Sequence, residues 1–131
     1  MDFEECVKKE IIKDIILDKY KINSIKEIAK EKIRSANYLP KKHHIAKISL
    51  LYDSLRRYLE ALALQEGYKI YNHQCYTAFI KEILKKSREG DLFDMLRRTR
   101  NNINYYGVHL EFAESEKIIK QLQQLIKIFS K

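Results

Sequence analysis

The amino-acid sequence predicts an all-α protein that folds as an up-and-down antiparallel helical bundle. Three glycines and one proline in 131 residues are too few for the many tight turns of a β-sandwich or β-barrel. Long stretches dominated by Lys, Glu, Ile, Leu and Ala favour helix. The apolar residues recur at helical spacing, and short connections favour antiparallel neighbours. We therefore expect one domain over residues 1–131, with an all-α fold.

Residues 2–19 carry apolar side chains at helical spacing, which predicts an additional N-terminal helix within residues 1–20. Ser24, with Glu27 three positions later, has the form of a capping box and predicts that a second helix begins at residue 25. This helix is expected to end near residue 38, because Pro40 disfavours helix in the residue before it.

The longest helix is expected over residues 41–66, where one apolar stripe ends at Gly67. Asn72 is a favourable N-cap for a fourth helix over residues 73–88. The stripe of the longest helix consists of Ile45, Ile48, Leu51, Tyr52, Leu55, Leu59, Leu62 and Ala63.

Asp91 is expected to begin a fifth helix over residues 92–106, which Gly107 ends. A sixth helix is expected over residues 111–129, because apolar residues recur along one side of it.

Cys6 and Cys75 lie far apart in the sequence, and neither belongs to a CxxC pair. A zinc site needs clustered ligands, and a secreted scaffold of this size usually carries more cysteines. We interpret both residues as buried or half-buried thiols, with a disulfide as the alternative.

No apolar segment approaches the roughly 18 residues that span a bilayer. The first ten residues lack the basic region and apolar block of a signal peptide. We therefore expect a cytoplasmic protein without membrane contact. The sequence contains no Walker loop, GxGxxG motif or HxxxH spacing, so we expect no cofactor and no metal.

The net charge of +8 is unevenly distributed along the chain. Residues 1–40 are nearly balanced, whereas residues 41–131 contain 17 basic and 10 acidic residues. A pI near 9.4 is compatible with a polyanionic partner such as nucleic acid. A Lys-rich solvated surface is the alternative interpretation.

The most unusual segment lies in the expected fifth helix, where three arginines fall within four residues without an acid. At about 100° per residue, Arg100 lies about 60° from the centre of the apolar face, with Asn104 about 40° further out. Arg97 and Arg98 are expected to point towards solvent. The residues expected to face the core are Leu92, Phe93, Leu96, Ile103 and Tyr106.

An arginine at the edge of a buried face needs an anionic or carbonyl partner. One candidate is Asp53 on the long helix, which would form an internal ion pair. The other is a phosphate, which a guanidinium binds through two parallel hydrogen bonds.

The string Arg100-Asn101-x-Ile103-x-Tyr105-Tyr106-Gly107 resembles the signature of the HEPN domain family (higher eukaryotes and prokaryotes nucleotide-binding). That signature is an arginine, usually followed by a polar residue, and a histidine after four to six positions. The stretch from Tyr58 to Tyr68, followed by Asn72-His73, is similar to the end of the family's long helix and the start of its next. The resemblance covers residues 25–130.

The resemblance implies an α-helical bundle that forms a homodimer, with the motif helices facing each other across a cleft. Many members are metal-independent ribonucleases, often toxins paired with a nucleotidyltransferase antitoxin. In such members the motif histidine acts as general base on a ribose hydroxyl, and the arginine stabilises the phosphate in the transition state.

This chain departs from the family at the motif histidine, because the required positions hold Tyr105, Tyr106 and Gly107. A phenol with a pKa near 10 is a poor general base at neutral pH, whereas an imidazole near 6.5 is well suited. His109 lies just beyond the motif. His73 is interpreted as a packing or capping residue, and the pair His43-His44 as a solvated basic turn.

Two functions therefore remain open. The first is a HEPN-like domain that binds RNA or nucleotide, as a weak or degenerate ribonuclease of a toxin–antitoxin or defence system. The second is a non-enzymatic helical homodimer that binds a protein. For the first, the expected catalytic residues are Arg100 and Tyr105, and the expected nucleic-acid-binding residues are Arg97, Asn101, Asn104, Tyr106 and His109.

Overall fold

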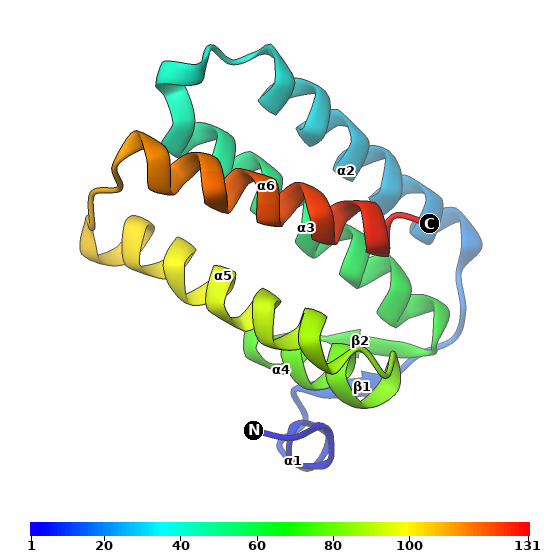
Figure 1. Ribbon diagram of the computed structural model, residues 1–131. Helices are drawn as coiled ribbons and strands as arrows, with labels where there is room; N and C mark the ends of the chain where they lie inside the picture. Colours follow the sequence, from blue (N-terminus) through cyan, green and yellow to red (C-terminus); the bar gives the residue numbers. More distant parts are fainter.

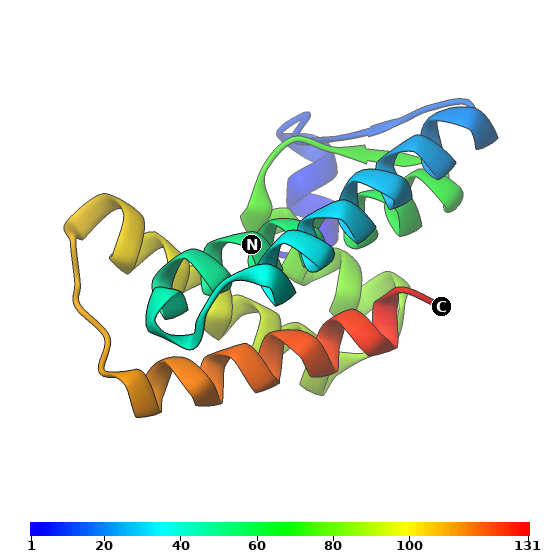
Figure 2. The ribbon, with the colours of Figure 1, turned by 90° about the horizontal axis from the view of Figure 1, so that it is seen from above.

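Helix α3 (His44–Gln65) lies at the centre of the structure, and the other long helices pack around it (Figure 1). These are α2 (Lys19–Tyr38), α5 (Ser87–Tyr106) and α6 (Phe112–Phe129), which alternate in direction along the chain. Seen from above, α6 and a small sheet lie on opposite sides of the α2–α3 pair (Figure 2). The computed structural model describes residues 1–131 and is 76% helical, which confirms the predicted all-α helical bundle.

The core forms where the apolar stripe of α3 meets the inner faces of its neighbours. Small side chains let α2 approach closely, since Ala29 and Ala36 are fully buried. The buried Ser54 hydroxyl donates to the Ala29 carbonyl at 2.9 Å, which joins α3 to α2. None of the helices combines the length and apolar character needed to cross a bilayer. The largest fully buried side chains include Tyr52, Phe79, Phe93, Ile48, Leu55, Leu59, Leu122 and Leu125.

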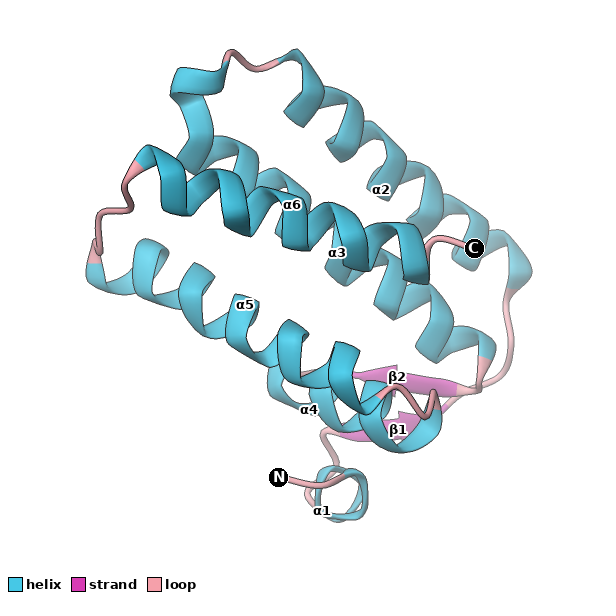
Figure 3. Ribbon diagram, viewed as in Figure 1, coloured by secondary structure: helices cyan, strands magenta, loops and turns pink.

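The N-terminal segment forms a short helix and a strand, so the prediction of one helix over residues 2–19 is wrong. Helix α1 (Phe3–Lys8) ends before Glu10, whose φ of 59° lies in the left-handed region. Strand β1 (Ile12–Asp14) then pairs with β2 (Tyr68–Ile70) in a small sheet (Figure 3). The two strands are antiparallel, and Ile12 lies opposite Ile70. β-Branched isoleucines fit a strand well, and pairing with β2 decides their conformation.

The N-terminus of α2 was also predicted wrongly. Asp18 is the N-cap and accepts from the Lys21 N–H at 3.1 Å, so the helix begins six residues before residue 25. Ser24 and Glu27, expected to form a capping box, lie inside the helix. At its other end the helix stops at Tyr38 as predicted, and the 3₁₀ turn η1 (Lys41–His43) leads into α3.

The fourth predicted helix is divided in the structure. Asn72 caps α4 (His73–Ala78) as expected, but the chain continues as a π-helix, η2 (Phe79–Ile83). This wider turn accompanies the complete burial of the consecutive residues Phe79 and Ile80. Helix α5 then begins earlier than predicted, and a Cβ at its buried Gly90 would collide with the Lys81 side chain.

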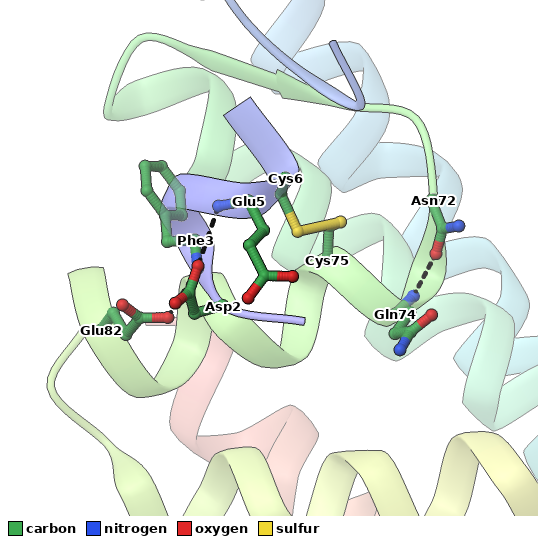
Figure 4. The surroundings of a disulfide bond; sticks show 8 residues. All are labelled: Asp2, Phe3, Glu5, Cys6, Asn72, Gln74, Cys75 and Glu82. Carbon is green, nitrogen blue, oxygen red and sulfur yellow. Dashed lines mark hydrogen bonds between the residues drawn. A yellow bond between two sulfur atoms is a disulfide. The ribbon is translucent and has the colours of Figure 1, made fainter. Parts of the chain in front are cut away.

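A disulfide between Cys6 and Cys75 joins α1 to α4, which corrects the expectation of two free thiols (Figure 4). Both residues are fully buried. The Phe3 amide also donates to the Glu82 carboxylate at 2.7 Å, so α1 is held at two points. Sequence spacing alone could not show that two cysteines separated by 69 positions meet in the core.

Replacing Cys75 by Ala is expected to lower the free energy of unfolding by about 4 kcal/mol, because the crosslink closes a loop of 69 residues. Denaturant titrations followed by circular dichroism measure this difference. Wild type unfolded in dithiothreitol should match the variant. Equal stability of the oxidised and reduced wild-type protein would contradict a structural role for the disulfide.

Candidate functional site

Arg100 on α5 lies at the edge of the core, as its helical position predicted. Its side chain is only 19% exposed, and its guanidinium Nη2 is 3.8 Å from the Asp53 Oδ1 on α3. The guanidinium carbon Cζ lies 5.3 Å from the centre of the Tyr52 ring, a cation–π distance. Asp53 is therefore the internal partner that the sequence offered.

The Arg100 guanidinium nevertheless keeps its hydrogen-bonding capacity. A separation of 3.8 Å is too long for a hydrogen bond, and the buried Nε has no partner. Asp53 also interacts with a second cation, because the Lys32 Nζ lies 3.9 Å from the carboxylate oxygen that does not face Arg100. Arg100 is thus held by charge and by an aromatic face, while its N–H donors remain unused.

Arg97 does not point freely into solvent, so this expectation is wrong. Its side chain is 17% exposed, and its Nε and Nη2 donate to the Asp94 Oδ1 at 3.2 and 2.9 Å. Burial alone would raise the pKa of Asp94, but the hydrogen bond and charge of Arg97 hold it below the usual value. Arg98 is 65% exposed, as predicted, and its Nε lies 3.3 Å from the same carboxylate.

Tyr52 brings His73 into the same region. The buried Tyr52 hydroxyl lies 3.1 Å from the His73 Nδ1 on α4. Burial raises the pKa of Tyr52 to about 12, although the charge of Arg100 opposes this change. Burial, together with the charges of Arg56 and Arg100, lowers the pKa of His73 to about 4. The imidazole is therefore neutral at pH 7.

Arg56 is a functional candidate that the sequence interpretation missed. It follows Tyr52 by one helical turn on α3 and is half-buried, yet it forms no ion pair and no hydrogen bond. Its charge lowers the pKa of His73. The i, i+4 spacing of Tyr52 and Arg56 on the longest helix was the available signal, and His73 was interpreted only as a packing or capping residue.

The remaining predicted site residues lie further along α5 and beyond it. Asn101 is half-buried and Asn104 is exposed. Tyr105 is 70% exposed and Tyr106 is 78% exposed, so the expectation that Tyr106 faces the core is wrong. His109 is exposed in the connection to α6, after Gly107 has ended the helix at a φ of 64°.

The two other histidines do not form a solvated pair. His44 is half-buried at the start of α3, where its Nδ1 lies 2.6 Å from the Ser115 hydroxyl. Its ring also meets Phe112 edge to face at 5.6 Å. His44 therefore joins α3 to α6 and satisfies the fully buried Ser115. The expectation of a solvated turn holds only for the exposed His43.

A surface groove of about 710 Å³ borders α4 and α5, with Arg97 and Arg98 among its lining residues. It also contains the carboxylates of Asp2, Glu82, Asp91 and Asp94. These negative charges offset its cations, so this groove does not favour an anionic ligand.

Comparison of this chain with protein-family models, with curated proteins and with solved structures finds no match.

Acidification is expected to destabilise the protein through His73. Between pH 6.5 and about pH 4 the unfolded chain binds a proton on His73 that the folded protein excludes, so stability falls as the pH falls through this window. Solvent screening of the half-exposed ring limits the effect to roughly 1–2 kcal/mol. Urea titrations at pH 7 and pH 4.5 measure it.

The matched variant is His73→Asn, which retains a hydrogen-bonding group for Tyr52 and removes the titration. Its loss of stability on acidification should be smaller than that of wild type. An identical loss of stability in both proteins would show that folding does not lower the pKa of His73.

Proposed function

We propose that this protein is a HEPN-like domain that binds RNA or nucleotide through Arg100, and that it acts as a weak, degenerate metal-independent ribonuclease in a toxin–antitoxin or defence system. The observation that supports this most directly is the state of the Arg100 guanidinium. It is held at 19% side-chain exposure, yet no hydrogen bond uses its donors. A phosphate would accept two of them in parallel.

The surroundings of Arg100 suit a polyanionic chain. Asn104 lies one helical turn further along α5, and Asn101 is half-buried beside it in sequence. The exposed rings of Tyr105 and Tyr106 offer surfaces on which bases can stack. Phosphate contact by Arg100 and base stacking by the tyrosines together describe binding to a single strand of RNA.

The absence of the motif histidine limits the proposed activity. Tyr105 takes that position, and phenols in general are poor bases at neutral pH compared with imidazoles. Loss of a general base typically lowers a rate by about 10²- to 10⁴-fold. Transition-state stabilisation by Arg100 would remain, which is why the proposal is weak cleavage.

The proposal includes a homodimer and a nucleotidyltransferase antitoxin as partners. The exposed apolar and aromatic surface at the end of α5, formed by Tyr105, Tyr106 and Val108, is compatible with a partner there.

The proposal also includes a cytoplasmic location. Among cytoplasmic proteins, stable buried disulfides are common chiefly in those of hyperthermophiles.

The second candidate function is a non-enzymatic helical homodimer that binds a protein. The contact between Arg100 and Asp53 favours it, because an internal ion pair would explain why an arginine lies at the core edge without any ligand. In that case Arg100 would contribute to stability and not to binding.

Arg100→Ala is expected to reduce the free energy of binding to single-stranded RNA by about 1.5–3 kcal/mol, the range for a charge-assisted hydrogen bond. Fluorescence anisotropy at several salt concentrations measures this change, and phosphate binding must weaken as salt rises. Arg98→Ala removes the same charge from the exposed side of α5 and should change affinity little.

Arg100→Lys separates the two functions. It keeps the positive charge near Asp53 but loses the paired donors, so RNA affinity should fall while stability is retained. Unchanged RNA affinity per folded molecule in Arg100→Ala would support the ion-pair interpretation.

Tyr105→His is expected to raise RNA cleavage above wild type, because it restores an imidazole five positions after Arg100. Cleavage of a labelled RNA in the presence of EDTA measures the effect. Tyr105→Phe, which lacks the imidazole, should show no gain, and the gain should disappear in the Arg100→Ala background. A gain that persists without Arg100 would separate cleavage from this site.

A further inference from the structure

The junction of α3, α4 and α5 carries more positive charge than its own carboxylates can balance. Asp53 lies close to Lys32 and Arg100, and Asp94 lies close to Arg97 and Arg98. Arg56 has no carboxylate within ion-pairing distance. Arg97 and Arg98 face the acid-rich groove, where carboxylates offset them. Around Asp53, however, three cations share one carboxylate, and the cations are Lys32, Arg56 and Arg100.

Both of these arginines leave hydrogen-bond donors unused although they are half-buried. The Arg100 Nε is fully buried without a hydrogen bond. Arg56 makes neither a hydrogen bond nor an ion pair from its intermediate position on α3. Removing a charged group from water is unfavourable unless a counter-charge or hydrogen bonds replace the water. Unused guanidinium donors on α3 and α5 at one junction favour an anion as an additional ligand.

His73 supplies a third, adaptable group at this junction. Its Nδ1 is engaged by the Tyr52 hydroxyl at 3.1 Å, which leaves Nε2 for a ligand. When the Tyr52 hydroxyl donates to Nδ1, Nε2 carries the proton and acts as a donor to an oxyanion. Tyr52 also carries Arg100 on its ring at 5.3 Å, so one buried side chain positions both groups.

We propose that Arg56, His73 and Arg100 form a binding site for one phosphate dianion where α3, α4 and α5 meet. An excess of two positive charges suits a dianionic phosphomonoester better than the single charge of an internal phosphodiester. The ligand is then a nucleoside monophosphate or the phosphorylated end of an RNA. The identification of the ligand as a nucleotide or RNA rests on the proposed function, whereas the binding of a phosphate dianion does not.

Isothermal titration calorimetry with AMP and with adenosine tests the site. AMP should bind and adenosine should not.

Arg56→Gln should weaken AMP binding by at least about tenfold, which corresponds to the loss of one charge-assisted hydrogen bond. Arg88→Gln removes an equal charge from an exposed position of α5 and serves as the control. If Arg56→Gln fails to fold, AMP binding is measured instead with Arg56→Lys, which keeps the positive charge. Equal AMP affinity in wild type and the Arg56 variants, or equal binding of AMP and adenosine, overturns the proposal.

The pH dependence of binding gives a second readout. Sulfate remains a dianion over this range, so its affinity changes only through the protein. A bound dianion raises the pKa of His73 from about 4, and affinity should therefore rise as the pH falls from about 8 to about 5. His73→Asn should abolish this rise, and an unchanged rise would remove His73 from the site. The charged or titratable groups around His73 are Tyr52, Asp53 and Arg56 on α3, and Arg97 and Arg100 on α5.

RNA oligonucleotides separate this inference from the proposed function. An oligonucleotide with a 5′-phosphate should bind more tightly than the same sequence with a 5′-hydroxyl, and Arg56→Gln should remove the difference. If both forms bind equally and depend on Arg100, RNA binding stands and the dianion site is wrong. If AMP binds through Arg56 while no RNA binds, the dianion site stands and the RNA-binding proposal is wrong.

Discussion

The burial of Tyr52 at the middle of α3 determines how the candidate site is arranged. Its ring stacks on Phe93 of α5 with 6.0 Å between centroids, and its hydroxyl contacts His73 of α4. Arg100 lies over the same ring. One side chain therefore fixes the relative positions of three helices and two polar groups. Tyr52 is itself fully buried, and the two arginines whose charges act on it most, Arg100 and Arg97, have side chains that are only 19% and 17% exposed.

The N-terminal segment supports this arrangement from outside the bundle. The disulfide between Cys6 and Cys75 and the pairing of β1 with β2 hold both ends of the segment that leads into α4. Cys75 lies two residues after His73, so the crosslink also restrains the helical turn that carries the imidazole. The extra N-terminal element, which the family resemblance does not cover, thereby contributes to the geometry of the candidate site.

Features that depend on a single helix were predicted correctly from the sequence. Features that depend on contacts between distant segments were not. The position of Arg100 at the core edge follows from helical periodicity alone, and it was predicted correctly. Arg97 was misplaced because Asp94, three residues earlier, draws its side chain back along the helix. The isoleucine-rich segment around Ile12 fits either a helix or a strand, and only pairing with residues 68–70 decides between them. The influence of the Arg56 charge on His73 depends on how α3 and α4 pack, which no local pattern reveals.

The central claim is that the Arg100 guanidinium binds an external phosphate, and that its main role is not the internal ion pair with Asp53. The most direct test is Asp53→Asn, analysed for both RNA affinity and the free energy of unfolding. The contact between these half-buried groups is 3.8 Å long, so its removal should change stability by less than about 1 kcal/mol. RNA affinity should rise, because the competing carboxylate charge is gone. Unchanged RNA affinity, together with a loss of stability of about 3 kcal/mol or more as for a broken buried ion pair, would contradict the account.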